Sequence, residues 1–456
     1  MKDFTQGNEA KLIFNFTLPM LLGNVFQQLY NIVDSVIVGN ILGKEALASV
    51  GASFPIIFTL IALVIGIGSG FSIVISQYFG AKDIDRVKRA IDTMYLFLFG
   101  SAILTSILGI YFSEELFQLL QLPAELVPQA KTYLNIYLGG MIVFFGFNGT
   151  SSVLRGLGDS KTPLVFLVMA SLFNILFDLL FIMVFEWGIA GAALATVVAQ
   201  AGAFVSALIY LNRGHKIMKF SLFKLKFDKE IFHTSFKIGL PSGLQHSFVA
   251  LGMMALLGIV NTFGTDVIAA YTAAGRIDSL AMMPAMNFAQ AVAAFVGQNL
   301  GANKINRVRS GFKVTFIMSS LFCLLMTLII VIFGSNLMEL FTTDPNVIEI
   351  GERYLIIVSS FYLLFSTMFT TNGVLRGAGD TLIPMFITLF SLWIIRIPAA
   401  YFLSGEIGET GIWWSIPAGW FIGMSFSYIY YRTGQWKTKS IVNHNDKIES
   451  IDIPVE

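Results

Sequence analysis

Charged residues are scarce in this chain. Only 12% of its 456 residues are Asp, Glu, Lys or Arg, whereas a soluble domain carries about a quarter. A soluble protein of this length could not cover its surface with so few charges. Hydrophobic residues make up 55% of the chain, which also excludes a disordered protein. Apolar runs of about 18 residues or more, each long enough to cross a bilayer, recur along nearly the whole length. We therefore predict an all-α polytopic membrane protein.

Cysteine and histidine are scarce as well. The single cysteine, Cys323, lies in an apolar run, and the chain has only four histidines. A disulfide framework and a cysteine-based metal site are therefore excluded. The G-x-x-x-x-G-K-[ST] sequence of a nucleotide-binding loop is missing, which argues against an ATP-driven pump. Since no converging nucleophile, base and metal set is evident, we expect no enzyme activity and no cofactor. With a net charge of +1, nucleic acid is not an expected partner.

The apolar runs divide into twelve predicted membrane spans. Most of the 29 lysines and arginines fall on one side when the amino terminus is placed in the cytoplasm. The positive-inside rule then puts both termini in the cytoplasm of a multi-pass protein of the plasma or inner membrane. The predicted spans cover residues 12–38, 46–79, 91–112, 131–154, 162–185, 188–211, 238–262, 267–298, 312–333, 352–374, 382–403 and 411–431.

Two motifs occur twice, and both pairs have the same separation along the chain. LRGLGDSKTPLVF begins at Leu154 and LRGAGDTLIPMF begins at Leu375; we call the separation between these two leucines the repeat offset. QYFGAKDIDRV begins at Gln77 and QNLGANKINRV begins at Gln298, again one repeat offset apart. The chain is therefore an internal duplication. Each half contains six spans, an even number, so the two six-helix lobes should be related by a pseudo-two-fold axis along the membrane normal.

These patterns predict four regions. An amino-terminal lobe covers residues 1–212, and a cytoplasmic inter-lobe linker covers residues 213–237. A carboxy-terminal lobe covers residues 238–436, and a polar cytoplasmic tail covers residues 437–456. Lysine and phenylalanine alternate in the linker, which indicates an amphipathic segment at the membrane surface. Two six-helix lobes are typical of transporters, although duplicated bundles also occur in enzymes and scaffolds.

Polar side chains in the amino-terminal lobe recur at helical spacing. In each of three spans they lie three or four residues apart, so they share one face of the helix. Charged residues within a span are costly in hydrocarbon and mark functional sites. The alternative is that each polar group only satisfies helix packing. The residues are Gln27, Tyr30, Asn31 and Asp34 in the first span, Asn174 and Asp178 in the fifth, and Thr196 and Gln200 in the sixth.

Asp34 and Asp178 are the two carboxylates of this lobe that lie deep in the spans. If they face one dehydrated space, both cannot stay ionised without a partner, and the pair titrates as a unit. A proton or a monovalent cation relieves the repulsion. The amide and hydroxyl oxygens of Asn174 and Thr196 are hard neutral ligands that would complete a Na+ shell beside a carboxylate.

Several motifs, in order and at repeat spacing, resemble the multidrug and toxic compound extrusion (MATE) family of secondary transporters. They are NIVDSVIVGNILG at the end of the first span, the two LRG-x-GD motifs, the two Gly-Ala loops with basic residues, and FVGQNLGA at 295–302. The resemblance covers about residues 10–435. It implies twelve helices in two lobes that form a V-shaped cleft. It also implies alternating-access export of amphipathic or cationic compounds in exchange for Na+ or H+.

By this resemblance, Asp34, Asn174, Asp178 and Thr196 match the cation-binding positions of the family's amino-terminal lobe. In one branch of the family the seventh and tenth helices carry acidic residues for a second cation site. Here those spans have no Asp or Glu in their interiors, so we expect coupling in the amino-terminal lobe alone. A flippase for a lipid-linked precursor, of related fold, is the alternative function, and we expect a monomer in the bilayer.

The carboxy-terminal lobe keeps a different polar set. Arg276, Asp278 and Arg396 lie within its spans, and they either hold the lobe together as ion pairs or contact substrate. Gln245 and His246 are further candidates for the cavity wall. In the first span, Pro19 permits a kink, and we hypothesise that cation occupancy at Asp34 changes the bend of this helix.

Overall fold

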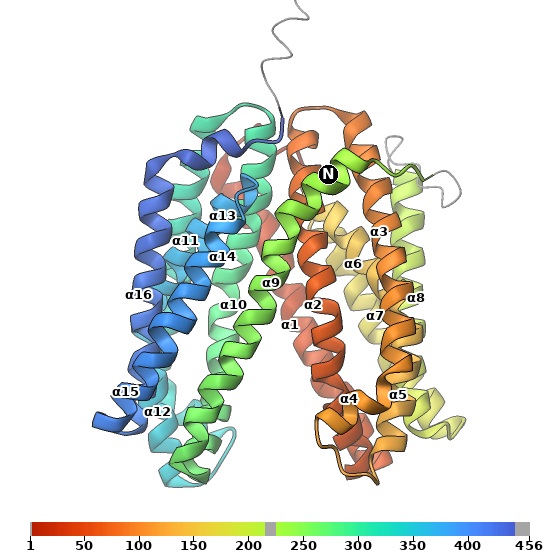
Figure 1. Cartoon of the computed structure of the whole chain (residues 1–456), viewed down its shortest axis with the longest axis vertical. Coiled ribbons are helices and arrows are strands. Elements are labelled where there is room, and N and C mark those ends of the chain that lie inside the picture. The colour runs from red at the N-terminus through yellow and green to blue at the C-terminus, as the bar shows by residue number, and fades with distance from the viewer. Residues whose placement is uncertain (1, 215–224, 443–456) are drawn as a thin grey trace, which may run out of the picture. The chain divides into compact units, whose positions relative to one another are not determined.

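The computed structural model describes residues 2–214 and 225–442. Throughout this described part the secondary structure is helical, and within each half the long helices run alongside one another (Figure 1). The first half contains α1 (Glu9–Ile37), η1 (Val38–Leu42), α2 (Lys44–Gly80), α3 (Ile84–Tyr111), α4 (Ser113–Leu119), α5 (Val127–Gly139), α6 (Met141–Gly156), α7 (Lys161–Leu179), η2 (Leu180–Val184) and α8 (Gly188–Gly214).

The second half follows the same order. It contains α9 (Lys229–Val260), η4 (Asn261–Phe263), α10 (Thr265–Gly301), α11 (Ile305–Glu339), α12 (Pro345–Ser359), α13 (Tyr362–Gly377), α14 (Leu382–Leu389), η5 (Phe390–Arg396), α15 (Ile397–Ile407), α16 (Glu409–Thr433) and η6 (Gln435–Lys439). The part of the predicted linker at 215–224 and the part of the predicted tail at 443–456 lie outside the described residues.

The helices agree with an all-α polytopic membrane protein. Eight are long and apolar enough to cross a membrane, and two bent pairs, α5 with α6 and α12 with α13, could each supply one more span. The bends within these pairs measure 50° and 49°. α1 and α16, with 29 and 25 residues, are not among these candidates. Each predicted span therefore coincides with one helix or one joined set of helices.

The duplication is visible in the backbone as well as in the sequence. Residues with positive φ recur at the repeat offset, because the same turns separate the same helices in both halves. A close approach also recurs: Gly156 packs against the Ser72 carbonyl, and Gly377 packs against the Ala293 carbonyl. The LRG glycines therefore serve helix packing. The positive-φ pairs are Gly43 with Gly264, Lys82 with Asn303, and Gly158 with Gly379.

Contacts divide the chain into two compact units that do not follow chain order. We call residues 1–2 and 18–243 the amino-terminal unit, and residues 3–17 and 244–456 the carboxy-terminal unit. Two helices therefore belong partly to each unit. α1 begins in the carboxy-terminal unit and continues into the amino-terminal unit, while α9 begins in the amino-terminal unit and continues into the carboxy-terminal unit.

Candidate cation-binding site

Three helices of the amino-terminal unit bring four of the predicted site residues together. Asn174 and Asp178 lie one turn apart on α7, and Thr196 lies on the neighbouring helix α8. All three side chains are buried, with 2%, 0% and 7% of their surface exposed. Asp34 on α1 is half-buried, and its carboxyl group lies within hydrogen-bonding range of the Asp178 carboxyl group.

The Asn174 amide connects α7 to α8 across this site. A carboxylate can only accept hydrogen bonds, so the amide must turn its nitrogen towards Asp178. In that orientation Asn174 Nδ2 donates to Asp178 Oδ2 over 2.9 Å, and Asn174 Oδ1 accepts from the Thr196 backbone N–H over 2.9 Å. The Thr196 hydroxyl lies 3.2 Å from the same oxygen. Asn174 therefore holds Asp178 and Thr196 in a fixed arrangement.

The two carboxyl groups are not fully satisfied by the protein. Asp34 Oδ1 and Asp178 Oδ1 are both buried and have no hydrogen-bond partner in the described part of the chain. No lysine or arginine of the described residues forms an ion pair with either group. Removing two carboxylates from water without a counter-charge is unfavourable. The site therefore has the chemistry to hold a proton or a small cation.

Three tyrosines surround the carboxyl pair, and two of them were not predicted. Tyr30 lies one turn before Asp34 on α1, and its hydroxyl is within hydrogen-bonding range of the Thr196 side chain. Tyr133 and Tyr137 on α5 stack on each other with ring centroids 6.2 Å apart, and both interact electrostatically with Asp34. Their i, i+4 spacing in the sequence was the signal that could have identified them.

Each aspartate lies within about one helical turn of the start of a π-helical segment. Asp34 lies four residues before η1, and Asp178 lies two residues before η2. The two π-helical segments contact each other. π-helical turns widen the helix, leave its hydrogen-bond ladder less regular and are frequent at functional sites. Near this site the backbone of α1 and α7 is therefore less regular than in the rest of each helix.

The other predicted residues of the amino-terminal lobe differ in their exposure. Gln27 and Asn31 on α1 are exposed, whereas Tyr30 and Asp34 on the same helix are half-buried. Gln200 on α8 is half-buried, one turn after Thr196. Pro19 lies inside α1, directly after the residue at which this helix passes from one unit to the other.

In the carboxy-terminal unit, Gln245 has a connecting role. Its side-chain nitrogen donates to Thr388 Oγ1 over 2.7 Å, and its side-chain oxygen accepts from Arg376 Nη2 over 3.1 Å. Gln245 thus ties the arginine of the second LRG-x-GD motif to α14. The adjacent His246 is exposed.

Asp278 lies in a buried cluster of the same unit. Its two carboxyl oxygens accept hydrogen bonds from the hydroxyls of Tyr362 over 2.6 Å and Tyr354 over 3.2 Å. Arg396 is 8% exposed and interacts electrostatically with Asp278. Arg276 is exposed and does not belong to this cluster. Unlike the carboxyl pair of the other unit, Asp278 has a protein partner for each oxygen and an arginine nearby.

Comparison with known proteins agrees with the motifs. The family model described as MatE matches residues 19–180 and again residues 241–402. The probable multidrug resistance protein YpnP of Bacillus subtilis (strain 168) is 35% identical over 446 residues, which is 96% of this chain and 98% of that protein. The probable multidrug resistance protein YoeA of the same strain is 31% identical over 435 residues, with 93% and 94% covered.

The fold is shared with solved structures. A crystal structure of a MATE in the bent conformation superimposes with a TM-score of 0.90 at 24% identity, covering 96% of this chain and 98% of that chain. The chain therefore belongs to the MatE family, the multidrug and toxic compound extrusion transporters. The family resemblance, the all-helical membrane fold and the assignment to a transporter rather than an enzyme are confirmed.

Proposed function

We propose that this transporter exports amphipathic or cationic compounds in exchange for H+ or Na+ by alternating access, and that the coupling cation binds between Asp34 and Asp178. The observation that carries the proposal is the pair of neighbouring carboxyl groups. Each keeps one buried oxygen without a partner, and no basic side chain of the described residues pairs with either. We further propose that both termini lie in the cytoplasm, because most lysines and arginines then fall on the cytoplasmic side.

A cation in this site would act on three helices at once. It would neutralise the repulsion between the carboxylates on α1 and α7. Because Asn174 is hydrogen-bonded to both Asp178 and Thr196, a shift of Asp178 would also move Thr196 on α8. A bound cation shifts a conformational equilibrium only by the difference in its affinity for the two states. The coupling therefore requires that the carboxyl pair binds the cation with different affinity in the two states. A change in the distance between Asp34 and Asp178 would produce such a difference.

The names of the relatives support the class of substrate. Both proteins from Bacillus subtilis are named probable multidrug resistance proteins, and each covers nearly the whole chain. Two carboxylates in the amino-terminal unit also favour a cationic substrate over an anionic one, because substrate and coupling cation could then compete for the same negative charge.

The test measures ethidium efflux from proteoliposomes under an imposed Na+ gradient, an imposed H+ gradient or no gradient. We expect efflux with at least one gradient, and loss of this response in Asp34→Asn and in Asp178→Asn. Asp85→Asn, a change at an exposed position, is the matched control and should transport normally. Equal efflux without any gradient, or a normal response in Asp34→Asn, would contradict the proposal. Competition by a lipid-linked pyrophosphate but not by ethidium would favour the flippase.

A further inference from the structure

The sharing of two helices between the units has a mechanical consequence. Residues 3–17 belong to the carboxy-terminal unit although the rest of α1 belongs to the other unit, and α9 passes between the units after Gly243. Prolines lie close to both crossing points, Pro19 in α1 and Pro241 in α9. Any rearrangement of the units must therefore bend these helices or release one of their anchored ends.

The anchored end of α9 is held by direct contact between backbones. Gly66 and Gly70 on α2 face Gly239 and Gly243 on α9. Within each helix the two glycines have the G-x-x-x-G spacing. A Cβ atom on Gly66 would collide with the Gly243 backbone, and one on Gly70 would collide with the Gly239 backbone. Small residues at this spacing allow the closest helix packing that occurs in membranes. Separating α2 from α9 would therefore lose this backbone contact, and no other contact would replace it.

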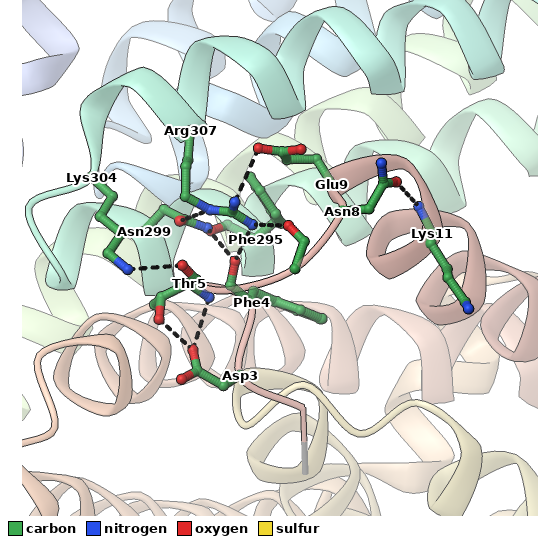
Figure 2. A network of polar contacts seen from close by, with 11 residues as sticks. Asp3, Phe4, Thr5, Asn8, Glu9, Lys11, Phe295, Asn299, Lys304 and Arg307 are labelled. Carbon is green, nitrogen blue, oxygen red and sulfur yellow. Dashed lines mark hydrogen bonds and ion pairs between the residues drawn. The ribbon is translucent and has the colours of Figure 1, made fainter.

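The anchored end of α1 is held differently. Residues 3–9 are held by side chains from the last turns of α10 and from the residues that follow it, as Figure 2 shows. Arg307 Nη2 donates to the carbonyl oxygens of Phe4 over 3.1 Å and Gly7 over 3.0 Å, and Nη1 forms an ion pair with Glu9 at 3.1 Å. Lys304 Nζ donates to the Thr5 carbonyl oxygen over 2.9 Å. We call this set of contacts the amino-terminal clamp.

One aromatic side chain completes the clamp. Phe4 is 1% exposed and packs against Phe16 and Phe295, with ring centroids 5.2 and 5.9 Å away. Its backbone N–H donates to the Gln298 side-chain oxygen over 2.9 Å, and its carbonyl accepts from Asn299 Nδ2 over 3.1 Å. The backbone of Phe4 is thus satisfied by side chains, and both of these hydrogen bonds are buried.

The anchored ends of α1 and α9 are held by different kinds of contact, although the two helices occupy equivalent places in the duplication. One repeat offset after Gly66 and Gly70 stand Asn287 and Ala291, so the glycine contact is not repeated in the carboxy-terminal unit. One repeat offset before Asn299 and Lys304 stand Tyr78 and Asp83, which lack the amide and ammonium donors of the clamp. In this loop the halves therefore differ at Asn299 and Lys304, whereas Gln298 and Arg307 have the identical counterparts Gln77 and Arg86.

We propose that the amino-terminal clamp is a latch that opens and closes in each transport cycle, whereas the glycine contact of α9 stays closed. The ion pair of Arg307 with Glu9 and its hydrogen bond to the Gly7 carbonyl oxygen are open to water, which can replace them when the clamp opens. A backbone contact between membrane helices has no such replacement. The latch rests on the alternating access of the proposed function. Its opening frees the first residues of α1, and α9 keeps the units connected.

The first experiment locks each anchor in turn, starting from Cys323→Ala so that the native thiol is removed. Glu9→Cys with Arg307→Cys is joined by a short, reducible bis-methanethiosulfonate reagent. The matched control joins Arg89→Cys with Asp228→Cys, an ion pair of 3.7 Å at the anchored end of α9. We expect cross-linking of the clamp to abolish gradient-driven ethidium efflux, and dithiothreitol to restore it, while the α9 pair transports throughout. Full efflux by the cross-linked clamp would overturn the latch.

The second experiment does not depend on the clamp's charged residues. Thr5→Cys and Ser235→Cys each place a thiol at a buried position, 5% and 0% exposed, in the clamp and in the α9 contact respectively. We expect maleimide to label Thr5→Cys several-fold faster during turnover than at rest, while Ser235→Cys stays protected. Equal labelling rates for Thr5→Cys in both conditions would overturn the latch even if the cross-linked pair fails to fold. Failure of the proposed function is distinct, because efflux would then not respond to any gradient.

Discussion

The side chains of Asp178 and Asp278 are both buried carboxyl groups in a membrane protein, yet their surroundings differ. Asp278 has a tyrosine hydroxyl on each oxygen and Arg396 nearby. Asp178 has the Asn174 amide on one oxygen and no partner of the described residues on the other. A buried charge that is paired and hydrogen-bonded is stable as it stands, whereas an unsatisfied one costs free energy until a ligand arrives. We therefore propose a structural role for Asp278 and cation binding for Asp178.

The structural role predicts the effect of removing one hydroxyl. Tyr362→Phe deletes the 2.6 Å hydrogen bond to Asp278 and should lower the free energy of unfolding by about 1.5–3 kcal/mol, the range for hydrogen bonds to charged groups. Thermal unfolding of the detergent-solubilised protein measures the change. Tyr401→Phe, at a side chain that is 67% exposed, serves as the control and should unfold like the wild type. An unchanged midpoint for Tyr362→Phe would refute this role.

At the scale of elements, glycine conformations and side-chain hydrogen bonds to the backbone fix the turns between helices. The LRG-x-GD turn after α6 places Gly158 at φ +80°, and Asp159 accepts hydrogen bonds from the backbone N–H groups of Lys161 and Thr162 at the start of α7. In the second motif, Asp380 accepts a hydrogen bond from the Tyr430 hydroxyl over 2.6 Å, a partner that no local pattern indicates.

This turn predicts an unequal response to two alanine substitutions. Gly158→Ala places a Cβ at positive φ and against the Lys2 carbonyl oxygen, so it should cost at least about 1–2 kcal/mol, the strain of a left-handed L-residue. Gly100→Ala in α3 adds a Cβ in open space at a helical position and should cost nothing, because alanine favours the helix. Unfolding midpoints of both variants, measured side by side, check the difference. Equal stability of the two would contradict the strain argument.

At the scale of the whole molecule, the two halves share the order of their helices but differ in the polar residues within them. The turns and the close helix contacts recur at the repeat offset, but the four residues of the candidate site do not. The equivalent positions in the second half are apolar, so that half cannot hold a cation in the same way. The replacements are Ala255 for Asp34, Ile395 for Asn174, Ala399 for Asp178 and Pro417 for Thr196.

This asymmetry predicts where ion dependence resides. In proteoliposomes under matched gradients, Asp278→Asn should keep the ion dependence of ethidium efflux, with at most a lower amount of folded protein. Asp178→Asn should lose the ion dependence while remaining folded, because Asn174 can still bond the new amide. The ratio of efflux with and without the gradient, normalised to folded protein, distinguishes the two. Loss of ion dependence in Asp278→Asn would place part of the coupling in the carboxy-terminal unit.

The sequence by itself determined the membrane class, the helical spans, the duplication and the family, because each depends on local composition, on periodicity or on spacing along the chain. It also indicated Asp34, Asn174, Asp178 and Thr196, since helical spacing places polar groups on shared faces. The tertiary structure decided which members of a stripe are covered: Tyr30 and Asp34 are half-buried, whereas Gln27 and Asn31 are exposed. It also decided that Tyr133 and Tyr137 join the site.

The division into units was decided by the tertiary structure as well. A boundary predicted from chain order cannot anticipate that residues 3–17 belong with the second half. That grouping depends on Arg307 and Lys304 reaching the backbone of Phe4 and Thr5, at the opposite end of the sequence from their own half. Helical periodicity fixes which side chains share a face of one helix. Which faces meet is set by contacts between residues remote in sequence, and these exist only once the helices have packed.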